Sequence, residues 1–293
     1  MSAALEMELV LDAGAETGEG PVWDFRDESV AWIDVTRGLI HRFDPDTGHD
    51  EVFDAGQHVG ALGLRAAGGY LLAVRGGFAT LDVESGVLEP IADTEAAAPS
   101  NRMNDGKCDS TGRFWAGSMA YAEAGREGSL YRLDRDHTVT KMLTQVGISN
   151  GLGWSPDDRV MYYIDSLAGG VDAYDFSPDT GQISRGRRLI DVAPDDGIPD
   201  GMTVDAEGYL WVAMWNGWSV RRYRPDGTFD RAIQLPVRQV SCCTFGGSDL
   251  GDLYITTAAR GQSESDLQQQ PGAGGVFRCQ PGVSGLATHE FRG

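Results

Sequence analysis

Glu19-Gly-Pro-Val-Trp-Asp24, Asn150-Gly-Leu-Gly-Trp-Ser155 and Asp200-Gly-Met-Thr-Val-Asp205 are three versions of one pattern. Each starts with an acid or amide residue and a glycine, and each continues as a short apolar run. A polar turn and a second apolar run follow in all three. Short runs rich in β-branched and aromatic residues, bounded by turn residues, predict strands. We find no long stretch with a helical period, so the sequence predicts an all-β fold.

The pattern recurs along the chain at intervals typical of a β-propeller. Copies begin near residues 19, 60, 104, 150, 200 and 241, which are 41 to 50 residues apart. Several short strands in a unit of that length indicate one propeller blade. Six units cover nearly the whole chain, which predicts a six-bladed β-propeller in a single domain over residues 1–293. The strand at 6–11 falls outside the first unit, and we expect it to complete the last blade and close the ring.

Composition and charge limit the classes of function. Hydrophobic residues make up 41% of the 293 residues, which indicates a folded chain, and the formal charge is −20. That charge repels phosphate, so nucleic acid and anionic membranes are not expected partners, whereas a bound cation is compatible with it. No apolar run is long enough to span a bilayer, and no signal peptide is recognisable. The four cysteines form no CxxC pair, so we expect reduced cysteines in a cytoplasmic protein.

The repeat predicts a metal site at the central axis. A propeller packs the first strand of every blade around one axis, so residues at the same phase of the repeat form a ring. The ring at the start of these strands is Glu19, Gly60, Asn104, Asn150, Asp200 and Ser241. Carboxylate and amide oxygens without His or Cys suit hard cations such as Ca²⁺, Mg²⁺ or Mn²⁺. The alternative is that each Asp-Gly or Asn-Gly pair only forms a turn.

Several motifs also resemble one known family, the regucalcin/gluconolactonase family. They occur in order from about residue 10 to 290, and they are Gly18-Glu-Gly-Pro21, Arg102-Met-Asn-Asp-Gly-Lys107, Gly112-Arg-Phe-Trp-Ala-Gly117, Ile148-Ser-Asn-Gly151, Pro199-Asp-Gly-Met202, Ser241-Cys-Cys-Thr-Phe-Gly-Gly247 and Gln270-Pro-Gly-Ala-Gly-Gly-Val-Phe277. The resemblance implies a six-bladed propeller with one divalent cation at the mouth of its axial tunnel.

The resemblance also implies roles for particular residues. The family's metal ligands fall on Glu19, Asn150 and Asp200. Asn104 falls on a residue beside the metal that contacts substrate, and Arg102 falls on a substrate-binding arginine.

One position departs from the family pattern. The substrate-contacting glutamate of regucalcin aligns with Ala122 in this chain. We expect Tyr121 to contact the substrate in its place, with Glu123 as the other candidate. Trp215 and Trp218, after a second strand in the fifth unit, either stack on a sugar face or pack between blades.

The expected activity is hydrolysis of sugar lactones, such as glucono- or pentono-lactone, to aldonic acids. The resemblance implies this reaction, and the cation, which is Ca, Mn, Zn, Mg or Fe, would polarise the carbonyl as a Lewis acid. Asp200 is the expected general base and then acid, and Arg102 suits sugar hydroxyls or a developing oxyanion. One alternative is a regucalcin-type calcium-binding regulatory protein without turnover. Another is a hydrolase of other esters or phosphotriesters.

Overall fold

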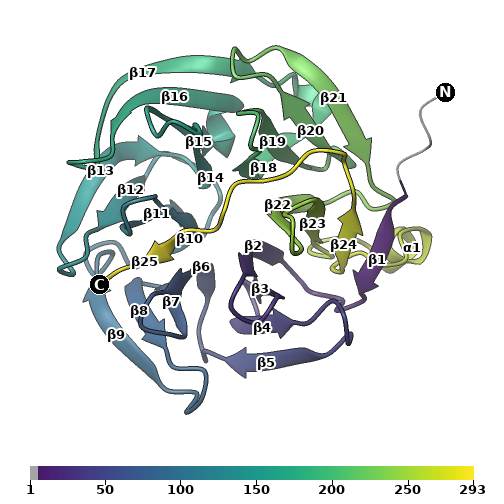
Figure 1. Cartoon of the computed structure of the whole chain (residues 1–293), viewed down its shortest axis with the longest axis horizontal. Coiled ribbons are helices and arrows are strands. Elements are labelled where there is room, and N and C mark those ends of the chain that lie inside the picture. Colours follow the sequence, from purple (N-terminus) through teal and green to yellow (C-terminus); the bar gives the residue numbers. More distant parts are fainter. Residues whose placement is uncertain (1–5) are drawn as a thin grey trace.

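Six sheets, each with four antiparallel strands as its blade, surround a central axis in the structure, a computed structural model that describes residues 6–293 (Figure 1). This confirms the predicted all-β, six-bladed propeller. The first three blades consist of β2 (Gly18–Asp24), β3 (Ser29–Asp34), β4 (Leu39–Phe43) and β5 (Asp50–Asp54); β6 (Val59–Arg65), β7 (Tyr70–Val74), β8 (Gly77–Leu81) and β9 (Leu88–Asp93); and β10 (Asn101–Cys108), β11 (Phe114–Ala120), β12 (Gly128–Leu133) and β13 (Val139–Val146).

The remaining blades follow the same order of strands. They consist of β14 (Ser149–Trp154), β15 (Val160–Asp165), β16 (Gly170–Ser177) and β17 (Gln182–Asp191); β18 (Ile198–Val204), β19 (Leu210–Trp215), β20 (Ser219–Tyr223) and β21 (Phe229–Gln234); and β22 (Val240–Gly246), β23 (Asp252–Thr257), β24 (Val276–Cys279) and β1 (Glu8–Leu11). Short 3₁₀ turns occur at Ser166–Ala168 and Pro194–Asp196. The first strand of each blade lies next to the axis.

The apolar core lies between neighbouring blades. Alternating side chains of one blade pack on those of the next, as Ile33 and Ile40 of the first blade do with Leu62 and Leu72 of the second. A second kind of contact fixes the hairpin between the first two strands. In the third blade the buried Asp109 accepts a hydrogen bond from Trp115 Nε1 at 3.0 Å. In the fifth blade Asp205 accepts one from Trp211 Nε1 at 2.9 Å and is also bonded by Arg222.

The Asp-Gly and Asn-Gly pairs of the repeat are inside strands, so the turn alternative is wrong for the fourth and fifth blades. Asn150-Gly151 lies in β14 and Asp200-Gly201 lies in β18. Their glycines are required by close packing around the axis. A Cβ on Gly151 would lie 2.7 Å from the carbonyl oxygen of Asp200, and one on Gly201 would lie 2.2 Å from Cys242 Sγ. The glycine therefore lets adjacent inner strands approach each other.

Every inner strand contains a β-bulge at the same phase of the repeat. In each blade the first strand has one residue more than the second strand across the bulge. The bulges lie between residues 19 and 22, 59 and 61, 103 and 106, 149 and 152, 199 and 202, and 240 and 242. Successive strand residues point to opposite faces, and a bulge shifts that alternation by one. Residues three positions apart across the bulge therefore share a face.

The two ends of the described chain are tied into different blades. β1 pairs antiparallel with β24 in the sixth blade, as predicted. The C-terminal part was not predicted: after β24 the chain crosses the axis, and β25 (Glu290–Phe291) pairs parallel with β6 of the second blade (Figure 1). The helix α1 (Glu264–Gln269), capped by Ser263, was also not predicted. All four cysteines are buried and free. Within residues 6–293 no helix is long and apolar enough to cross a membrane.

Candidate metal and substrate site

A cavity of about 130 Å³ with both polar and apolar lining residues opens at one end of the axis, where the inner strands β2, β10, β14 and β18 begin. Five of the predicted site residues line it: Glu19, Arg102, Asn104, Asn150 and Asp200. They come from four different blades and span 182 positions of the sequence, from 19 to 200, so only the circular arrangement of the blades brings them together.

Two buried carboxylates dominate the electrostatics of the cavity. Burial raises the pKa of the Glu19 carboxyl well above its usual range, and the negative charges of Asp200 and Asp105 raise it further. Burial and the charge of Asp105 likewise raise the pKa of Asp200. Like charges that are removed from water repel each other strongly, and a cation between them relieves this repulsion.

The amide of Asn150 supports a cation site beside these acids. Its Nδ2 donates to Asp200 Oδ1 and, at 3.0 Å, to Ser166 Oγ. These bonds fix the orientation of the amide. Asn150 Oδ1 is buried without a hydrogen-bond partner among the described residues. A buried acceptor with no partner costs free energy, and a metal ion would satisfy it.

The set of donors fits a hard divalent cation. Within residues 6–293 no three His, Cys, Asp or Glu side chains are grouped as metal ligands. A cation here therefore depends on the amide oxygen of Asn150 in addition to the carboxylates of Glu19 and Asp200. Oxygen donors of this kind suit Ca²⁺, Mg²⁺ or Mn²⁺, with water filling the remaining positions.

Arg102 and Asn104 form a connected pair on the cavity wall. Arg102 Nη1 donates to Asn104 Oδ1 at 2.7 Å and to the carbonyl oxygen of Met103 at 3.1 Å. Asn104 Nδ2 donates to the carbonyl oxygen of Ser149 at 2.7 Å. Arg102 is only 6% exposed, and no carboxylate of the described residues forms an ion pair with it. Its remaining N–H groups are available to a polar ligand.

Glu123 lines the cavity, whereas Tyr121 is not among the lining residues. The Tyr121 ring lies 5.4 Å from the His58 ring, measured between centroids, and Ala122 is exposed. Glu123 has a positive φ of 53°, which turns the chain sharply after β11. Its carboxylate forms a 2.6 Å ion pair with Arg260, which also lines the cavity.

The sequence did not predict Arg260 as a site residue, and it did not decide whether Trp215 lies in the site or between blades. Trp215, at the end of β19, lines the cavity, whereas Trp218 is not among the lining residues. Arg260 lies in the loop after β23, outside the conserved phase of the repeat, so no periodic signal marks it. The positive charge of Arg260 is close enough to affect Arg102, because burial and then this charge lower the pKa of the Arg102 guanidinium.

Known proteins share this fold and sequence over nearly the whole chain. Residues 17–259 match the family described as SMP-30/Gluconolactonase/LRE-like region. Regucalcin of Xenopus laevis is 38% identical over 99% of this chain and 100% of its own, and human regucalcin gives the same figures. A solved structure of a calcium-binding protein, regucalcin, from Agrobacterium tumefaciens has a TM-score of 0.95 at 26% identity over 99% of this chain and 98% of its own.

The fold and the cavity together define a six-bladed β-propeller with an acid-lined pocket at its axis. The chain belongs to the SMP-30/gluconolactonase/LRE-like family. This confirms the family resemblance found in the sequence motifs. A gluconolactonase from Xanthomonas campestris, 22% identical with a TM-score of 0.78 over 94% of this chain and 89% of its own, shares the fold.

Proposed function

We propose that the protein is a divalent-metal-dependent lactonase that hydrolyses sugar lactones to aldonic acids. The observation that carries the proposal is the cavity at the axis. There, the acids Glu19 and Asp200 lie with the Asn150 amide oxygen and the Arg102 guanidinium. Within residues 6–293 that oxygen has no hydrogen-bond partner and that guanidinium forms no ion pair. A cavity with hydrogen-bond donors for a sugar next to the proposed cation site suits a small polyhydroxylated ester. Family membership supports the same reaction class.

The residues that line the cavity have different roles in the proposed reaction. When bound, the divalent cation supplies a Lewis acid that polarises the lactone carbonyl. Arg102 and Asn104 bind and orient the sugar hydroxyls, and the Arg102 guanidinium stabilises negative charge on the carbonyl oxygen. Glu123 and Arg260 present a second polar pair at the same cavity.

Asp200 moves the proton of the reaction. One of its carboxylate oxygens accepts a proton from water as the water oxygen attacks the carbonyl carbon. The bond between that carbon and the ring oxygen then breaks, and the ring oxygen receives the proton back from Asp200. The bond from Asn150 holds Oδ1 of Asp200 in place, where its second lone pair would serve the cation, and Oδ2 accepts the proton. The product is an open-chain aldonic acid, so one water is consumed and atoms balance.

The test is a lactone panel on metal-stripped protein. Hydrolysis of glucono- and pentono-lactones should disappear after chelation and return when Ca²⁺, Mn²⁺, Zn²⁺, Mg²⁺ or Fe²⁺ is added singly. Full activity of thoroughly stripped protein would overturn the metal dependence. Binding of Ca²⁺ without hydrolysis of any lactone under any of these cations would instead identify a regucalcin-type calcium-binding protein without turnover.

A further inference from the structure

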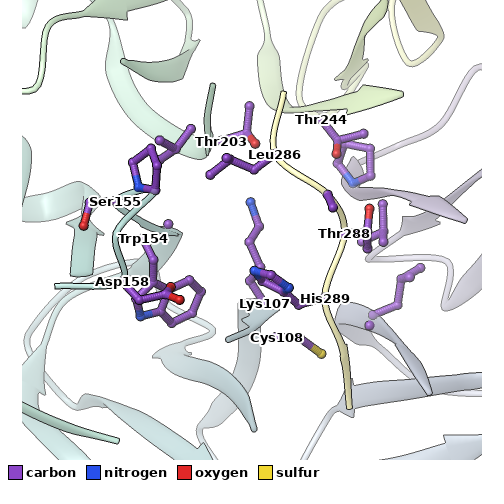
Figure 2. Close-up of a pocket in the computed structure, with 18 residues that line it drawn as sticks. Lys107, Cys108, Trp154, Ser155, Asp158, Thr203, Thr244, Leu286, Thr288 and His289 are labelled. Carbon is purple, nitrogen blue, oxygen red and sulfur yellow. The ribbon is translucent and has the colours of Figure 1, made fainter. Parts of the chain in front are cut away.

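A second, larger cavity lies at the other end of the same axis (Figure 2). Its volume is about 300 Å³, which is within the range of ligand pockets in proteins. The residues three positions after the ring that begins the inner strands all line it: Val22, Gly63, Lys107, Gly153, Thr203 and Thr244. Because of the bulge in each inner strand, the residues that begin these strands and the residues three positions later both face the axis. Three residues of strand separate the two sets by roughly 10 Å.

The C-terminal crossing segment, residues 285–290, covers this end of the axis. It is attached on one side where Gly285 N–H donates to the carbonyl oxygen of Leu250 at 2.8 Å. On the other side β25 pairs with β6. Leu286 and Thr288 between these attachments line the cavity, and Figure 2 shows the segment passing beside the Lys107 side chain. The segment therefore makes a pocket out of what would otherwise be an open channel end.

Lys107 is the polar group around which this cavity is built. Its Nζ donates to the carbonyl oxygen of Met202 at 2.7 Å, and within residues 6–293 it forms no ion pair. Two of its three N–H groups therefore remain for a ligand. Figure 2 shows its side chain pointing into the middle of the cavity. Asp158, the carboxylate among the lining residues, is half exposed, so water screens its charge.

The remaining wall combines apolar surface with hydroxyl groups. Leu62, Trp154, Val204 and Leu286 supply apolar side chains. The hydroxyls of Thr203, Thr244 and Thr288 make no hydrogen bond to another side chain or to the backbone in the part of the chain that is described. An ammonium group with two N–H donors left for a ligand, free hydroxyls and an apolar wall suit a ligand with an anionic head and an apolar body.

We propose that this cavity is a second ligand site that binds a small monocarboxylate with an apolar tail, with Lys107 as the partner of the carboxylate. The site is separate from the lactone cavity because different residues of the same inner strands line the two. Neither the metal site nor any hydrolytic activity is needed for it.

The test uses octanoate as the probe and 1-octanol as its neutral counterpart. Calorimetric titration of octanoate into the protein, with a chelator present, should show saturable binding at one site. 1-Octanol should bind at least about tenfold more weakly, because it lacks the charged partner for Lys107. Absence of saturable octanoate binding at millimolar concentrations would mean that the cavity is only a solvent-filled channel end, and it would overturn the proposal.

Three variants locate the site. Lys107→Met keeps an unbranched side chain one atom shorter, removes the charge, and should weaken octanoate binding at least about tenfold. Leu286→Trp fills the cavity from the crossing segment and should also abolish binding, which keeps the proposal testable if Lys107→Met does not fold. Asp200→Asn, in the other cavity, should leave octanoate affinity unchanged. Unchanged affinity in both cavity variants, or a loss of affinity in Asp200→Asn alone, would place the ligand elsewhere and contradict the proposal.

Discussion

The acids at the axis are held in an arrangement that is costly without a counterion. Glu19 and Asp200 are 8% and 7% exposed, and Asn150, which donates to Asp200, has an amide oxygen without a partner among residues 6–293. Packing alone does not require such a cluster, because apolar residues of similar size would fill a propeller channel at a lower desolvation cost. At the scale of single residues, this cost supports the proposed cation site.

Asp200→Asn tests the proposed base directly, because it keeps the size of the side chain and removes its charge. We expect kcat for lactone hydrolysis to fall by at least about a hundredfold, with weaker metal affinity measured by titration. Asp195→Asn, in the exposed turn before β18, is the matched control and should change neither quantity. Retained turnover in Asp200→Asn at saturating metal would exclude Asp200 as the base.

Glu123→Gln tests whether the ion pair with Arg260 selects the substrate. Both side chains are partly exposed, at 43% and 37%, so the pair contributes little to stability and Tm should not change. We expect KM for sugar lactones to rise several-fold with a smaller effect on kcat. Tyr121→Phe provides the comparison, since Tyr121 is not among the lining residues. A larger effect of Tyr121→Phe on KM would restore the expectation that Tyr121 contacts the substrate.

In two blades a buried aspartate stabilises the hairpin between the first two strands. Asp205 is fully buried, and it accepts bonds from Trp211 Nε1 and from Arg222, which also stacks over the Tyr209 ring at 3.7 Å. Asp109 makes the corresponding bond to Trp115 in the third blade. The common spacing of six residues between Asp and Trp is visible in the sequence and marks the turn between the first two strands of a blade.

Removing one of these acids should weaken the whole fold. Asp205→Ala leaves the Trp211 N–H and the Arg222 guanidinium without their buried partner, so we expect unfolding free energy to fall by about 3 kcal/mol. Urea unfolding followed by tryptophan fluorescence measures this change. Asp226→Ala, in an exposed turn where Asp226 accepts a hydrogen bond from the N–H of Thr228, should cost far less. Equal losses in the two variants would refute a special role for the buried acid.

The repeat in the sequence predicted the fold, and the positions shared by its copies predicted the site. Glu19, Asn104, Asn150 and Asp200 were found because they occupy equivalent positions in four blades, and the blades place equivalent positions around one axis. Arg260 and the crossing segment have no counterpart in the other units, so periodicity carries no information about them. Trp215 was left open because strand alternation alone does not separate a side chain in a cavity from one between blades.

At the scale of the whole molecule, β1 closes the ring by supplying the outer strand of the sixth blade. Deletion of residues 1–11 removes its pairing with β24 and the 2.7 Å ion pair between Glu8 and Arg278. We expect unfolding free energy to fall by about 2 kcal/mol, measured as a lower Tm and urea midpoint. Glu8→Gln keeps the backbone pairing and should leave Tm nearly unchanged. If the truncated protein matched the full chain in both measurements, closure by β1 would not be a source of stability.

The bulge shared by the six inner strands has a consequence for how such a protein tolerates changes in length. Deleting a single residue there, for example Gly151, would turn the rest of that strand over and exchange its channel-facing side chains for those packed between blades. The outer turns, such as the one around Gly48 between β4 and β5, carry no such requirement, since they lie outside the paired strands. Insertions and deletions should therefore accumulate at the rim, while the six inner strands keep a fixed count of residues.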